Sequence, residues 1–124
     1  MGRYYNGDIE GKFWFGVQSS SDADFFGSEG FATNYLEYYF DKNHLEKIKK
    51  GIKECKKELG EYKKKLDDFF NKNNGYNEEM IEKELKISIP KIKTLLEWYA
   101  RLKLGNKILE CVEKTGYCEF EAEL

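Results

Sequence analysis

Residues 43–70 read NHLEKIKKGIKECKKELGEYKKKLDDFF. Apolar residues recur there at alternating intervals of three and four, which places them along one narrow edge of a helix. The members of this edge are Leu45, Ile48, Ile52, Cys55, Leu59, Tyr62, Leu66 and Phe69. Lysine and glutamate fill most of the other positions, so burying the edge requires a partner helix. The stretch therefore predicts one long helix from Asn43 to Phe70 that packs against another.

A second helix with a matching edge is predicted from Asn77, its expected cap, to Gly116, its expected stop. Its edge residues again alternate at intervals of four and three: Ile81, Leu85, Ser88, Ile92, Leu95, Tyr99 and Leu102. The polar segment 71–75 between the two helices predicts an antiparallel hairpin. Because Pro90 lacks an amide hydrogen, we expect a kink there, or two nearly collinear helices, rather than a reversal.

The two ends of the chain are predicted to form strands. Residues 12–18 and 117–124 alternate in polarity, and residues 34–40 are dense in aromatic side chains. The last strand is expected to insert beside an N-terminal strand. The predicted fold is therefore α+β, with a small antiparallel sheet packed against a long antiparallel helical hairpin. We expect a single domain over residues 1–124, divided into strands and a loop (1–42), the hairpin (43–115) and the final strand (116–124).

Composition and charge restrict the class of protein. The chain has 124 residues, of which 40% are hydrophobic and 16% aromatic, enough for one buried core. There is no long apolar run for a membrane span and no signal peptide pattern, so we expect a soluble, intracellular protein without a membrane partner. The sequence pI near 5.6 argues against nucleic acid as a partner, although residues 43–115 carry 18 basic and 13 acidic residues.

Three cysteines, an odd number, do not indicate a disulfide framework. Cys55 falls on the first helix edge, Cys111 on a helical pattern, and Cys118 alternates inward with Phe120. Each is interpreted as a small core residue rather than as a reactive group. No cofactor motif is present, so no cofactor and no metal site is predicted.

Four carboxylates form the densest acidic set of the N-terminal half. Asp8 and Glu10 lie two apart on a turn-rich strand, and Asp22 and Asp24 lie in the following loop. Solvated turn residues and helix caps are the favoured interpretation. The alternative is a small metal-dependent hydrolase in which the four carboxylates hold a divalent cation and supply an acid and a base.

The aromatic side chains of the predicted sheet exceed what one small core needs. Either helices cover one face and a second subunit the other, or one face stacks on a planar ligand. Residues 19–30 form a long polar loop beside it, and such loops are often functional. The candidate ligand- or partner-binding residues are Trp14, Asp22, Asp24, Tyr35 and Tyr38. Burial in a homo-oligomer is favoured over a ligand platform.

Residues 3–15, 22–27 and 111–120 resemble the ends of small uncharacterised proteins of large DNA viruses and viral metagenomes. The resemblance covers the ends of the chain and implies a viral origin; it supplies no catalytic residues. The sequence predicts a non-enzymatic binding protein whose aromatic surface and loop hold a small ligand or a partner protein, and the resemblance implies that the protein is viral and that the partner is a host protein. Without a credible catalytic set, enzymatic activity is not the favoured prediction.

Overall fold

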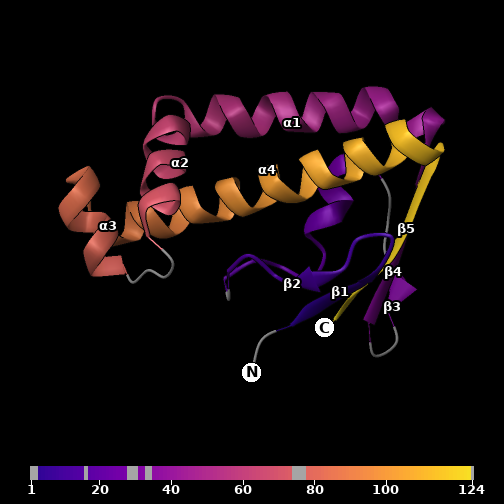
Figure 1. Cartoon of the computed structure of the whole chain (residues 1–124), viewed down its shortest axis with the longest axis horizontal. Helices are drawn as coiled ribbons and strands as arrows, with labels where there is room; N and C mark the ends of the chain where they lie inside the picture. Colours follow the sequence, from indigo (N-terminus) through magenta and orange to yellow (C-terminus); the bar gives the residue numbers. More distant parts are fainter. Residues whose placement is uncertain (1–2, 16, 28–30, 33–34, 74–77, 124) are drawn as a thin grey trace.

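The computed structural model describes residues 3–15, 17–27, 31–32, 35–73 and 78–123 (Figure 1). Asn77, the predicted cap, lies outside these ranges, as do Gly16 of the predicted strand 12–18 and residues 28–30 of the predicted loop. The elements, with 3₁₀ turns labelled η, are β1 (Tyr4–Gly7), β2 (Gly11–Lys12), η1 (Asp22–Phe26), β3 (Phe31–Ala32), β4 (Tyr35–Asp41), η2 (Lys42–His44), α1 (Leu45–Leu59), α2 (Tyr62–Lys72), α3 (Glu78–Leu85), α4 (Ile89–Thr115) and β5 (Tyr117–Glu123).

The five strands form one antiparallel sheet in the order β2-β1-β5-β4-β3. The last strand, β5, lies at its centre, between β1 and β4, which confirms that the C-terminal strand inserts beside an N-terminal one. Its pairing with β4 runs from Tyr35 opposite Glu123 to Asp41 opposite Tyr117. The α+β fold class is therefore confirmed.

Alternation along β4 and β5 separates the two faces of the sheet. The inward side chains are Leu36, Tyr38, Phe40, Cys118, Phe120 and Ala122, all buried. The rings of Tyr38, Phe40 and Phe120 stack on one another beneath the helices. On the outer face Tyr39 and Tyr117 are 47% and 46% exposed, beside the exposed Glu119. One covered face therefore takes up many of the rings, and the predicted burial of the outer face in an oligomer stays a prediction.

The helical hairpin consists of α1 and α4, which run antiparallel and make the most extensive contact between helices (Figure 1). The prediction of one continuous helix over residues 43–70 was wrong, because the structure has two separate helices there, α1 and α2. A positive φ of 54° at Gly60 separates α1 from α2, and α2 leaves the line of α1. A left-handed backbone is readily adopted only by glycine, so Gly60 ends the helix although the apolar spacing continues past it.

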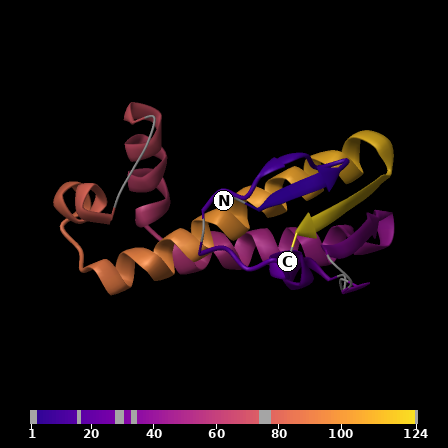
Figure 2. The same cartoon turned by 90° about the horizontal axis from the view of Figure 1, so that it is seen from below.

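The expected kink or collinear arrangement at Pro90 was also wrong. Lys86, with φ 57°, directly follows the end of α3 at Leu85, and Pro90 lies in the first turn of α4, where its missing amide costs no hydrogen bond. Figures 1 and 2 show α3 turned away from the axis of α4, with α2 and α3 gathered at the end of the molecule remote from the sheet. Ser88, assigned to the apolar edge, is the exposed residue that precedes α4.

The predicted strand over residues 12–18 was largely wrong. Among the described residues of this stretch, Lys12 pairs with β1 as part of β2 (Gly11–Lys12), and the Phe13 amide donates to the Arg3 carbonyl at 2.9 Å before the chain leaves the sheet. Phe13 and Phe15 are nevertheless buried, whereas Val17 is 44% exposed. Burial of the two phenylalanines in the core between sheet and helices outweighs the strand tendency of the alternating pattern.

Phe26 anchors the loop before β3 between the two long helices. Its ring is fully buried. A Cβ atom added at Gly51 of α1 would lie 2.7 Å from its Cδ1, and one added at Gly105 of α4 would lie 2.6 Å from its Cε1 and Cζ. The ring thus occupies the space that side chains at these two positions would need, and it fixes how closely α1, η1 and α4 pack.

We predict that Gly105→Ala destabilises the protein. Alanine in place of glycine within a helix normally stabilises by about 1 kcal/mol, but here the new methyl group overlaps a ring that Gly51 confines from the other side. Overpacking costs about 1–3 kcal/mol, and subtracting the helix gain of about 1 kcal/mol leaves a net loss of up to about 2 kcal/mol in the free energy of unfolding, which urea denaturation measures.

Two variants control this prediction. Asn106→Ala, at the exposed neighbouring position, should change the free energy of unfolding by about 0.5 kcal/mol or less. In a Phe26→Leu background, which vacates part of the ring volume, Gly105→Ala should no longer destabilise. Equal destabilisation in both backgrounds would contradict the packing described here.

Candidate functional site

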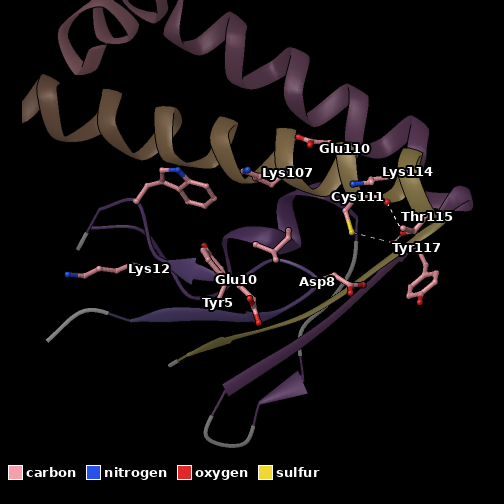
Figure 3. Close-up of a pocket in the computed structure, with 12 residues that line it drawn as sticks. Tyr5, Asp8, Glu10, Lys12, Lys107, Glu110, Cys111, Lys114, Thr115 and Tyr117 are labelled. Atoms are coloured by element: carbon pink, nitrogen blue, oxygen red, sulfur yellow. Dashed lines mark hydrogen bonds between the residues drawn. The ribbon is translucent and has the colours of Figure 1, made fainter. Parts of the chain in front are cut away.

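A cavity of about 600 Å³ lies between the C-terminal part of α4 and the turn that joins β1 to β2 (Figure 3). Its lining comprises Tyr5, Asp8, Ile9, Glu10, Lys12, Trp14, Lys107, Glu110, Cys111, Lys114, Thr115 and Tyr117. Figure 3 shows the helix residues above the space and the hairpin residues below it. Small-molecule pockets in proteins commonly measure about 300–1,000 Å³, so the cavity is of ligand size.

Helical spacing explains why α4 contributes one coherent wall. Lys107, Cys111 and Lys114 lie four and then three residues apart, with Glu110 beside them, and such positions share a helix face. The last turn projects this face over the β1–β2 hairpin (Figure 3).

Gly7 brings the opposite wall close to β5. With φ 122°, it adopts a conformation that favours glycine, and an added Cβ would lie 2.7 Å from the Glu119 carbonyl oxygen. The next residue, Asp8, is then held by β5 in two ways. Its amide donates to the Glu119 carbonyl at 2.7 Å, and its Oδ2 accepts from the Glu119 amide at 2.9 Å. The Asp8 carboxylate is therefore fixed at the edge of the cavity.

The positive and negative charges of the cavity lining are equal in number. Lys12, Lys107 and Lys114 oppose Asp8, Glu10 and Glu110. Within the part of the chain that the structure describes, none of these three lysines is in an ion pair. The cavity therefore offers charges of both signs alongside the rings of Tyr5 and Trp14, whose centroids lie 5.8 Å apart.

Two thiols and a carboxylate meet at one end of the cavity. Ligand atoms of Asp8, Cys111 and Cys118 all lie within 4.8 Å of one another, and this is the only such group of three or more among the described residues. Cys118 is buried, Cys111 half-buried and Asp8 exposed. Burial, then the neighbouring Cys111 thiol and Asp8, raises the pKa of the Cys118 thiol.

Hydrogen bonds fix the junction between α4, which carries Cys111, and β5, which carries Cys118. Gly116, with φ 90°, closes α4 by donating its amide to the Val112 carbonyl at 2.8 Å. The Thr115 hydroxyl lies 2.9 Å from the Cys111 carbonyl and 2.8 Å from the Tyr117 carbonyl, to which the Cys111 thiol also donates, at 3.4 Å. The spacing of the two thiols is thus built into the junction of α4 and β5.

The predicted binding residues lie in different environments. Trp14 is half-buried and lines the cavity. Tyr38 is only 3% exposed, and its hydroxyl donates to Asp24 at 2.5 Å. Burial and this hydrogen bond raise the pKa of Tyr38. Tyr35 begins β4, and its side chain lies outside what the structure describes. Contact of Tyr35, Tyr38 and Asp24 with a ligand stays a prediction.

Asp22 belongs to an internal polar network. The Arg101 Nε donates to its Oδ1 at 2.7 Å and the Gln18 Nε2 to its Oδ2 at 2.9 Å. The Arg101 guanidinium also lies over the rings of Phe25 and Trp98, 5.0 and 4.5 Å from their centroids. This hydrogen-bonded pair ties η1 to α4, and breaking it would leave the buried Asp22 carboxylate without its cation.

The four carboxylates of the alternative hydrolase do not assemble into one metal-binding group among the described residues. Asp8 and Glu10 line the cavity, whereas Asp22 is paired with Arg101 and Asp24 accepts from Tyr38. The geometry therefore separates the set into two solvent-facing acids at the hairpin and two acids that hold η1 in place.

Sequence reasoning missed the residues that α4 and β5 bring to the cavity. The shared helix face of Lys107, Cys111 and Lys114 was a usable signal. Cys55, Cys111 and Cys118 were each assigned to the core. The assignment is confirmed for Cys55 and Cys118, which are buried, whereas Cys111 is half-buried. The meeting of Cys111 and Cys118 with Asp8 depends on the sheet order, which places β1 beside β5, and no local pattern encodes that order.

Comparisons of the chain with protein-family models, with curated proteins and with solved structures give no match. None of the helices in the described ranges is both long and apolar enough to cross a membrane.

We predict that Cys111 is the most reactive thiol of the reduced protein in buffer with a chelator. The thiolate is the nucleophile, and burial raises the pKa of the Cys55 thiol to about 12 and also raises the pKa of the Cys118 thiol. Iodoacetamide followed by peptide mass spectrometry should show early modification at Cys111. Labelling of Cys55 or Cys118 at the same rate would contradict this, and Cys111→Ser should remove the fast phase.

Proposed function

We propose that this protein is a non-enzymatic binding module that holds a small organic ligand in the cavity between α4 and the β1–β2 hairpin. The single observation that carries the proposal is the composition of that cavity: a ligand-sized space lined by three aromatic residues, Tyr5, Trp14 and Tyr117, and by several charged groups. Trp14, expected from the sequence to contact a ligand, is one of the three, so the proposal retains part of the predicted surface.

The balance of charge favours a particular class of ligand. Three lysines and three carboxylates give the lining no net charge, so it does not attract a polyanion by long-range electrostatics. Fixed charges of opposite sign around aromatic rings suit a small zwitterion with a planar body, because stacking and two oppositely charged contacts then act together. Nucleic acid is not part of this proposal.

Because the ends of the chain resemble viral proteins, we extend the proposal to an infected host cell as the place where the protein acts. In an infected host cell, a module of this kind would sequester a host metabolite or a host protein. Self-association through the outer face of the sheet is compatible with ligand binding, because most of the cavity lining comes from α4 and the β1–β2 hairpin, although Tyr117 belongs both to that face and to the lining. An intracellular location and a viral origin are no evidence for a catalytic role. Ligand binding in the cavity requires neither of them.

The test uses fluorescence of Trp14 in a Trp98→Phe background, where it is the only tryptophan. A panel of aromatic amino acids and nucleosides is titrated into the protein, and native mass spectrometry of gently purified protein reports any mass that co-purifies. Saturable quenching by a zwitterionic aromatic compound is the expected result. If no compound changes the fluorescence and the native mass is that of the bare chain, the binding proposal fails.

Charge reversal on α4 supplies the matched comparison. Lys107→Glu removes a cation from the cavity and should weaken binding about tenfold or more, the loss expected for a charge-assisted contact of about 1.5–3 kcal/mol. Lys93→Glu makes the same change at an exposed position of α4 that does not line the cavity. It should leave the dissociation constant unchanged. Equal effects of the two variants would mean that the cavity is not the binding site.

A further inference from the structure

Asp8, Cys111 and Cys118 come from three elements, yet their ligand atoms lie within 4.8 Å of one another. Core packing accounts for the buried Cys118, and hydrogen bonds with Glu119 hold the exposed Asp8, but neither requires the carboxylate to lie against two thiols. The residues also share a chemical property, because thiolates and carboxylates are both ligands of Zn²⁺.

We propose that Asp8, Cys111 and Cys118 form a zinc-binding site at the end of the cavity. Two sulfur ligands favour Zn²⁺ over the hard cations Mg²⁺ and Ca²⁺, which take oxygen ligands. Two thiolates on one tetrahedral Zn²⁺ lie roughly 3.7 Å apart. Ligand atoms already within 4.8 Å of one another therefore need only small side-chain rotations to reach it.

The surroundings of the three residues support a prepared site. The Glu119 amide holds one oxygen of Asp8, at 2.9 Å, which leaves the other oxygen available as a ligand. The backbone that carries the cysteines is fixed by the hydrogen bonds of Thr115 and Gly116. Outer partners of this kind orient metal ligands and account for a substantial part of affinity.

The cavity gives the site an entry path and an open position. Cys111 and Asp8 both line it, so a cation reaches them from solvent. Three protein ligands leave the fourth position of a tetrahedral Zn²⁺ facing the cavity, where a water or a ligand group binds. Lys114, which lines the same cavity, carries a positive charge that offsets part of the excess negative charge of two thiolates and a carboxylate.

The site does not depend on the proposed organic ligand, so the experiment uses Zn²⁺ alone. The reduced full-length chain is titrated with Zn²⁺ by isothermal titration calorimetry in the presence of a phosphine reductant. Co²⁺ substitution is followed by thiolate-to-metal charge-transfer absorption. The expected result is one Zn²⁺ per chain and a cobalt spectrum of a tetrahedral site with sulfur ligands.

Variants decide which residues bind the ion. Cys111→Ser and Asp8→Asn should each weaken Zn²⁺ binding about tenfold or more, and asparagine retains an oxygen that accepts from the Glu119 amide. Cys55→Ala is the matched control, because Cys55 is a buried cysteine outside the group. It should bind Zn²⁺ as the unaltered chain does, with folding checked by circular dichroism.

Three results would overturn the proposal: no binding of Zn²⁺, binding that Cys111→Ser and Asp8→Asn leave unchanged, or a Cys111–Cys118 disulfide that persists under the reductant. Lys107→Glu separates this site from the proposed function, since it should weaken organic ligand binding about tenfold or more while one Zn²⁺ per chain is retained. Cys118→Ala adds a third ligand test if it folds; if it does not fold, Cys111→Ser and Asp8→Asn decide whether the site exists.

Discussion

The ring of Phe26, enclosed between Gly51 of α1 and Gly105 of α4, is the contact on which the other layers depend. Glycine at both positions lets the two helices close around the ring, which draws η1 up against them. Two polar contacts then secure η1. Asp22 pairs with Arg101 of α4, and Asp24 accepts from Tyr38 of β4. Helices, 3₁₀ turn and sheet are thereby held in one arrangement.

That arrangement determines where α4 ends relative to the sheet. α4 runs past η1 toward the sheet and reverses at Gly116 into β5, the central strand (Figure 1). Because β1 pairs with β5, the turn after β1 must lie beneath the last turns of α4. The cavity, its charged lining and the group formed by Asp8, Cys111 and Cys118 all follow from this reversal.

The sequence predicted the α+β class, the antiparallel helix pair and the C-terminal strand, because each is encoded by local periodicity. It failed at Gly60 and Lys86, where left-handed backbone conformations redirect the chain while the apolar spacing continues unchanged. Among the predicted binding residues whose side chains the structure describes, Trp14 alone lines the cavity. Cys111, Cys118 and Lys107 were missed because their significance depends on long-range strand order, which pattern reasoning does not supply.

The most direct measurement is a crystal structure of the protein grown with Zn²⁺, with anomalous diffraction recorded on both sides of the zinc absorption edge. We predict one strong anomalous peak per chain, bounded by the Asp8 carboxylate and the sulfur atoms of Cys111 and Cys118. A well-ordered structure in which these three side chains lie apart, or in which the peak lies elsewhere, would contradict the zinc site and the chain reversal that creates it.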